Sequence, residues 1–187
     1  VLHGVKELGA AAEAAGKRFL FESSVMDGIP VFSFLRAMPG TAVRSFEGIL
    51  NSTTNIILTE MEDRQCTFDA ALKKAQDEGI AERDPSGDVD GHDAATKVAV
   101  LSAVVLGADG AQAARAISTA GIGHVTLDDI NAASKRRERL KLICSCGRGD
   151  DGTITGKVSP VPLFCAATCA AAPLANAPVL VDTHTHT

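Results

Sequence analysis

The chain contains stretches in which apolar residues recur at helical spacing and others in which they alternate with polar residues. A spacing of three and four predicts amphipathic helices, and alternation predicts strands with one buried face. We expect helices over residues 1–17, 30–37, 67–78 and 111–120, and after Asn55, Gly91 and Thr126. We expect strands over residues 18–22, 42–50, 140–145 and 154–161, the last two joined by a polar hairpin.

These elements follow each other loosely, without the strict repeat of a parallel α/β fold. We therefore expect an α+β domain in which a mixed sheet carries helices mainly on one face. A chain of 187 residues is long enough for one domain with a buried core, expected over residues 1–161. Residues 162–187 are rich in alanine and proline and lose all periodicity, which predicts an irregular C-terminal tail.

One stretch, residues 79–97, concentrates the charge of the chain: GIAERDPSGDVDGHDAATK. Its first part, residues 79–91, is punctuated by proline and glycine and should form a turn-rich loop, called here the acidic loop. The pattern after Gly91 is helical, and Asp90 is expected to cap that helix. Asp93 and Lys97 then stand at positions i and i+4 on one face.

Two interpretations of the Asp93–Lys97 pair are possible. It can be a solvated surface pair that contributes about 0.3–0.5 kcal/mol. Alternatively, it is buried, because the sequence continues with the apolar run VAVLSAVV, and a buried ion pair is costly unless something uses it. An acidic loop folded against a buried lysine would suit a small polar molecule that carries its own ammonium group.

Two further stretches have a structural and a functional interpretation. Asn51-Ser-Thr-Thr-Asn55 leads from a strand into a helix, where the motif can be an ordinary cap or can present Thr53 and free amides to an anionic group. Glu22 ends the predicted strand over residues 18–22. Its carboxylate can accept hydrogen bonds from backbone amides, or it can join loop carbonyls around a hard cation.

The pattern Ala81-Glu82, Asp84-Pro85, Asp88-Val89-x-Gly91-x-Asp93-x-x-x-Lys97 resembles the signature of homoserine dehydrogenase. The stretches 48–55 and 21–30 also resemble that family, in the same order and at the same spacing. The resemblance covers residues 1–161. It implies the NAD(P)-dependent interconversion of aspartate 4-semialdehyde and L-homoserine, an amino-acid substrate of threonine, methionine and isoleucine biosynthesis.

The resemblance also implies roles for individual residues. Lys97 would be the proton donor, with Asp93 beside it as the second catalytic residue. The substrate would be bound by Glu82, Asp88, Asp93 and Thr53. A monovalent cation, with Na+ as the candidate, would be bound by Glu22 and by the main-chain oxygens of Val25, Asp27 and Ile29.

The nucleotide-binding part of the family is not visible in this sequence, since no G-x-G-x-x-G motif follows a strand. We expect most cofactor-binding residues upstream of residue 1, and we expect the chain alone to be inactive. The resemblance further implies a homodimer built at the sheet. An alternative is a truncated module of the same family that dimerises without catalysing.

Composition narrows the partners and the location. The net charge is −5, and no basic patch follows any element, so neither nucleic acid nor an anionic membrane is an expected partner. The longest apolar run, residues 98–106, is too short to span a bilayer. Five cysteines without a signal-peptide pattern predict a reducing, cytoplasmic location. Cys144 and Cys146 could begin a metal site, but no second ligand pair follows at zinc spacing.

Overall fold

The computed structural model describes residues 2, 4–26, 29–38, 40–164 and 180–185. Its centre is a five-stranded mixed sheet in the order β2-β4-β3-β1-β5. The strands are β1 (Thr41–Gly48), β2 (Ile117–Thr119), β3 (Glu138–Arg148), β4 (Ile154–Phe164) and β5 (Leu180–Thr185). β2 runs parallel to β4, and the other pairs are antiparallel. The predicted α+β class and the predicted hairpin between β3 and β4 are confirmed.

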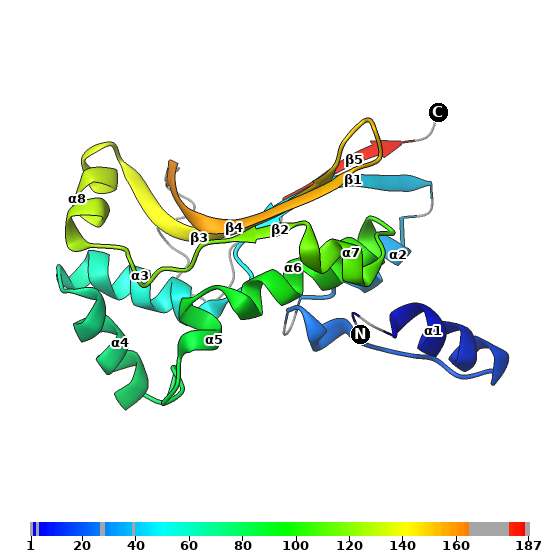
Figure 1. Ribbon diagram of the computed structural model, residues 1–187, viewed down its shortest axis with the longest axis horizontal. Coiled ribbons are helices and arrows are strands. Elements are labelled where there is room, and N and C mark those ends of the chain that lie inside the picture. The colour runs from blue at the N-terminus through cyan, green and yellow to red at the C-terminus, as the bar shows by residue number, and fades with distance from the viewer. Residues whose placement is uncertain (1, 3, 27–28, 39, 165–179, 186–187) are drawn as a thin grey trace.

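The helices gather on one side of this sheet, with α3, α6 and α7 beneath it in Figure 1. In chain order the helices are α1 (Val5–Ala14), η1 (the 3-10 turn Glu22–Ser24), α2 (Val31–Arg36), α3 (Ser52–Arg64), α4 (Phe68–Asp77), α5 (Ser86–Val89), α6 (His92–Val105), α7 (Gly110–Arg115) and α8 (Leu127–Lys135). Thr67 caps α4 as predicted, because its side chain accepts a hydrogen bond from the amide of Ala70. Thr126 caps α8 in a capping box with Asp129.

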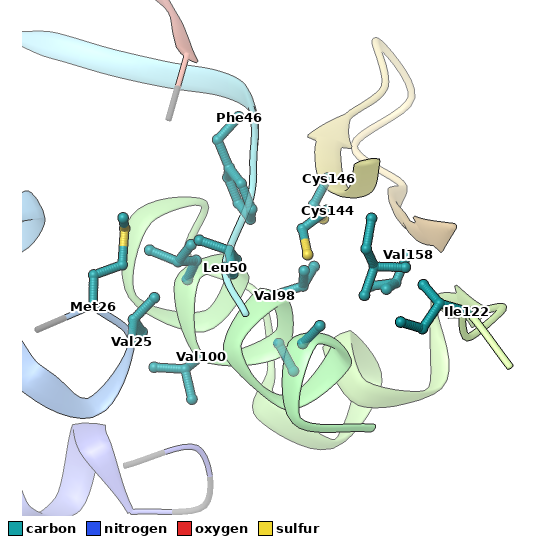
Figure 2. Packing of buried hydrophobic residues seen from close by; sticks show 14 of the residues in the cluster. Val25, Met26, Phe46, Leu50, Val98, Val100, Ile122, Cys144, Cys146 and Val158 are labelled. Carbon is teal, nitrogen blue, oxygen red and sulfur yellow. The ribbon is translucent and has the colours of Figure 1, made fainter. Parts of the chain in front are cut away.

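The core lies between the sheet and α6. Strand alternation turns Cys144, Cys146 and Val158 toward the helices, where they meet Val98 of α6 (Figure 2). Leu101 of α6 is 1 % exposed. α6 is apolar on nearly all sides, so most of it is buried, and its charged residues are confined to its first two turns. The polar start of α6 therefore reaches the surface from a buried helix.

Two predicted elements are wrong. Residues 18–22 form no strand, because Glu22 begins a 3-10 turn and its carboxylate bonds to α2 instead. The helix predicted over residues 111–120 ends at Arg115, and β2 replaces its second half. β2 pairs in parallel with β4, and this pairing satisfies backbone groups that a longer helix would have satisfied internally.

Asp90 is not the cap of α6. It ends α5 with helical backbone angles, and Gly91 is the N-cap at φ +82°, a conformation that favours glycine. The prediction of an irregular tail after residue 161 is also wrong in part. β4 continues to Phe164, and β5 pairs with β1. β5 forms because the outer edge of β1 offers unpaired backbone groups. Residues 165–179 lie outside the described ranges.

Candidate active site

The first turn of α3, the acidic loop and the first turns of α6 meet at one place. Asn51 precedes α3, and its side-chain oxygen accepts a hydrogen bond from the Thr54 amide at 2.8 Å. The acidic loop contains α5, and the Ile122 amide donates to the Val89 oxygen at 2.8 Å. A Cβ on Gly121 would collide with the backbone of Val89, so this glycine allows the close approach. The loop is therefore packed in a defined position.

A network of four side chains lies at this junction. Lys97 Nζ is 2.8 Å from Asp93 Oδ2 and donates to the Leu50 carbonyl at 3.1 Å. Asn51 Nδ2 donates to Asp88 Oδ1 at 2.6 Å and to Asp93 Oδ2 at 3.0 Å. The structure thus brings together Asp88, Asp93 and Lys97, all predicted, and adds Asn51, which was not.

The Asp93–Lys97 pair fits neither of the two interpretations fully. The Lys97 side chain is 25 % exposed and that of Asp93 is 38 % exposed. The pair is too covered for an ordinary solvated pair and too open for a buried one. It lies at the surface end of a buried helix, where a bound molecule can reach both groups.

The network has spare capacity for a ligand. An ammonium group has three N–H donors, and the contacts of Lys97 within the described residues use two of them. Asp88 Oδ2 and Asp93 Oδ1 have no hydrogen-bond partner among the described residues. With both carboxylates and the lysine ionised, the network carries one net negative charge. It can therefore attract a cationic group while donating a hydrogen bond to an oxygen.

The other predicted substrate residues lie around this network. Thr53, in the first turn of α3, is 7 % exposed. Glu82 is exposed on the acidic loop; its main-chain oxygen accepts a hydrogen bond from Gln76 at 3.1 Å. Its carboxylate contacts no other side chain in the described part of the protein. The structure does not bring Glu82 into the network.

Cys144 lies behind the network, on β3. Burial raises the pKa of its thiol to about 11, against a smaller opposing effect of a hydrogen bond with the Leu50 backbone. Burial also raises the pKa of Cys146, whose sulfur accepts a hydrogen bond from Ser102. Both thiols are therefore neutral at pH 7. Within the described ranges, no group of three or more His, Cys, Asp or Glu residues is placed to hold a metal ion.

The Glu22 carboxylate accepts hydrogen bonds from backbone amides, as the first of its two interpretations predicted. Its carboxylate accepts hydrogen bonds from the Phe32 amide at 2.6 Å and from the Ser33 hydroxyl at 2.7 Å, and Arg36 lies 3.4 Å away. Burial raises the pKa of Glu22, but the hydrogen bonds from Ser33 and Phe32 outweigh this and lower it overall. With the Ser33 amide at 3.2 Å, four donor groups surround this carboxylate, which has about four lone-pair positions.

The remaining ligands of the expected cation site are main-chain oxygens. Val25 is buried, Ile29 is partly exposed, and Asp27 lies outside the described residues. A cation at Glu22 would have to displace a donor that holds the start of α2. The monovalent cation site therefore stays a prediction from the resemblance.

Two hollows of about 420 and 660 Å³ lie elsewhere on the surface. The first is over the sheet strands β1, β3 and β4, and the second is between α2, β1 and the end of α6. Neither of these two hollows is lined by a residue of the network. No helix of the described residues is long and apolar enough to cross a membrane.

The comparison with known proteins identifies the family of the chain. Residues 30–186 match the profile of the family described as homoserine dehydrogenase. The NAD(+)-dependent homoserine dehydrogenase of Pseudomonas canavaninivorans is 41 % identical over 160 residues, which are 85 % of this chain and 44 % of that protein. The homoserine dehydrogenase of Methanocaldococcus jannaschii is 35 % identical over 84 % of this chain and 46 % of its own length.

Solved structures give the same result. A homoserine dehydrogenase from Thiobacillus denitrificans matches 98 % of this chain and 42 % of its own, with 36 % identity and a TM-score of 0.86. A putative homoserine dehydrogenase from Archaeoglobus fulgidus matches 98 % of this chain and 55 % of its own, with 29 % identity and a TM-score of 0.82. The chain spans about half the length of these relatives or less. On its sequence, its fold and the network between α3, α5 and α6, the chain belongs to the homoserine dehydrogenase family.

Proposed function

We propose that the chain is the catalytic and dimerisation domain of a homoserine dehydrogenase, which interconverts aspartate 4-semialdehyde and L-homoserine with NAD(P). The observation that carries the proposal is the state of Lys97. Its ammonium group is held by Asp93 and by the Leu50 carbonyl, and one of its N–H donors remains for a substrate oxygen. This is what a proton donor to a carbonyl requires.

Each functional group of the substrate has a counterpart in the chain. In the reducing direction Lys97 delivers a proton to the aldehyde oxygen, and in the oxidising direction it accepts one from the hydroxyl. The substrate ammonium lies against the free oxygens of Asp88 and Asp93. Glu82 is exposed on the acidic loop outside the network, so its contact with the ammonium stays a prediction from the resemblance. The substrate carboxylate lies at the start of α3, where Thr53 and free amides favour an anion.

The nicotinamide supplies and receives the hydride, so the protein has only to bind, orient and move a proton. The Pseudomonas relative is described as NAD(+)-dependent, and a solved hyperthermophilic archaeal homoserine dehydrogenase is a complex with NADPH. Either nucleotide is therefore compatible with this domain, whose product would serve threonine, methionine and isoleucine synthesis in the cytoplasm.

A homodimer is supported by the sheet face opposite the helices. Small and polar residues of β1, β3 and β4, namely Ser45, Glu47, Ser145, Gly147 and Lys157, line a hollow of about 420 Å³ there. Since no helix in the described ranges covers this face in Figure 1, a second copy is its proposed occupant. The Na+ expected from the resemblance stays a prediction, and at the Glu22 carboxylate it would compete with the hydrogen-bond donors of α2.

The test is a pair of matched lysine variants in the full-length protein. Lys97→Ala should lower kcat for homoserine oxidation by about 10²–10⁴-fold, the usual contribution of a positioned proton donor. Lys73→Ala is the control, because Lys73 forms the same kind of i, i+4 pair with Asp77 on the exposed surface of α4. The measurements are the rise of reduced-nicotinamide absorbance and a thermal melt. Near-normal turnover by the folded Lys97→Ala variant would refute the proposed role.

A further inference from the structure

Asn51 has every polar atom of its side chain engaged. It is 4 % exposed, its nitrogen donates to Asp88 and Asp93, and its oxygen accepts from the amide and the hydroxyl of Thr54 at 2.8 and 2.9 Å. The contacts of the oxygen fix the rotation of the amide group. The nitrogen must then lie on the side of the two carboxylates.

The side-chain nitrogen of Asn51 links carboxylates from two different helices, and this link is called here the Asn51 bridge. Asp88 is on α5, Asp93 is on α6, and one nitrogen lies within hydrogen-bond distance of an oxygen from each. Two ionised carboxylates that share one hydrogen-bond donor group repel each other, and donors between them offset this repulsion. Asn51 provides those donors without adding charge, so the net negative charge of the network is retained.

The bridge also determines which oxygens remain for a ligand. Asn51 occupies one oxygen of Asp88 and, together with Lys97, one oxygen of Asp93. The second oxygen of each carboxylate has no partner among the described residues. The distance between the proposed ammonium site and the proton on Lys97 therefore depends on a residue that neither donates the proton nor binds the ammonium.

We infer that Asn51 is a positioning residue of this site: its amide group fixes Asp88 against the Asp93–Lys97 pair and so sets the spacing between the substrate ammonium and the transferred proton. This inference rests on the proposed function. It predicts lower kcat/KM for an amino acid whose reacting oxygen lies at a different distance from its ammonium group, because Asn51 sets that distance in the site.

The competing explanation is that Asn51 only caps α3. The two roles separate cleanly, because Asn, Asp and Ser cap helices about equally well. Asn51→Asp and Asn51→Ser keep an acceptor for the Thr54 amide. The aspartate has no donor, and the shorter serine has one O–H in place of the two N–H groups that reach the carboxylates. Asn51→Ala removes both the acceptor and the donors.

The experiment measures thermal melts, kcat, homoserine KM and the pH profile of kcat/KM for these variants in the full-length protein. We expect Asn51→Asp and Asn51→Ser to lower kcat at least tenfold while the melting temperature stays within a few degrees of wild type. In Asn51→Asp the acidic limb of the pH profile should move to higher pH. The charged or titratable groups around the new carboxylate are Asp88 of α5, Asp93 and Lys97 of α6, and the Cys144 thiol of β3.

Wild-type kcat and an unmoved pH profile in both variants would overturn the inference and leave Asn51 as a cap. If neither variant folds, Asn51 is a structural residue and the inference also fails. The Lys97→Ala variant separates this result from the proposed function. When Lys97→Ala is inactive and the two Asn51 variants are normal, only the bridge is refuted, and when Lys97→Ala is active, the proposed function itself is refuted.

Discussion

Replacing Gly121 by alanine should move the acidic loop and with it Asp88. An added Cβ would lie 2.5 Å from the Cα and 2.7 Å from the carbonyl carbon of Asp90, and closer still to the Val89 oxygen. These are backbone atoms, which cannot rotate away as a side chain can. Ordinary carbon–oxygen contacts are about 3.3–3.6 Å, so the two segments must separate by roughly 1 Å.

The cost has two parts. The hydrogen bond from the Ile122 amide to the Val89 oxygen, 2.8 Å long, would be lost, at about 0.5–1.5 kcal/mol. Forcing an extra methyl group into a packed contact costs about 1–3 kcal/mol more. A total of about 1.5–4.5 kcal/mol corresponds to a fall in melting temperature of roughly 3–18 °C for a chain of this size. A displacement of about 1 Å at a reacting group can lower the rate roughly 100-fold.

The assay compares Gly121→Ala with Gly87→Ala by thermal melts and homoserine kinetics. Gly87 lies in α5 on the same loop, and a Cβ there would meet no atom within 4 Å. Its replacement should leave activity intact and raise stability by up to about 1 kcal/mol, since alanine favours helix. A Gly121→Ala variant that melts at the wild-type temperature would refute the close packing. A lowered melting temperature with unchanged kcat/KM would refute the link between the loop position and the chemistry.

Two further predictions concern single ionisable side chains. Glu82→Gln should raise the KM for homoserine several-fold more than the KM for the nucleotide, because its free carboxylate is proposed to contact only the substrate ammonium; equal changes in both would contradict that contact. Cys144 has a pKa raised from 9.0 to about 11 by burial, so its contribution of about 2–3 kcal/mol is complete below pH 9 and is lost as the pH rises from 9 through 11. Urea unfolding across this range should show a steeper loss of stability in wild type than in Cys144→Ala, with Cys66→Ala, at a less buried cysteine, keeping the wild-type slope.

Features whose causes lie within a few residues could be predicted from the sequence. The caps at Thr67 and Thr126 are examples, since each acceptor lies three residues before its donor. The hairpin between β3 and β4 also followed from local alternation. β5 could not be predicted in this way. It begins at Leu180, and its partner β1 begins at Thr41, which is 139 residues earlier in the chain. β2 was missed for the same reason, since only its pairing with β4 distinguishes it from the end of a helix.

In the site, too, only features that depend on neighbouring residues could be predicted from the sequence. The proximity of Asp93 and Lys97 follows from helical spacing and is confirmed at 2.8 Å. The role of Asn51 as a cap was an open alternative in the sequence. Its bridge to Asp88 and Asp93 was not visible, because these acceptors follow 37 and 42 residues later. The N-cap of α6 is Gly91 and not Asp90, because the backbone there has a positive φ. The general preference of aspartate for N-cap positions led to the wrong prediction.

A neutral bridge between two carboxylates has a consequence for the ligand. A lysine or arginine at position 51 could also hold Asp88 and Asp93 together, but its charge would cancel the net negative charge of the network. Asn51 orders the carboxylates and leaves that charge in place, beside the free N–H of Lys97. Such a site is organised before the ligand arrives, yet it remains electrostatically incomplete until a cationic group binds. An amino-acid substrate would supply that cation and the oxygen for Lys97 on one molecule, so the proposed function predicts that this network favours homoserine over an uncharged alcohol of the same length.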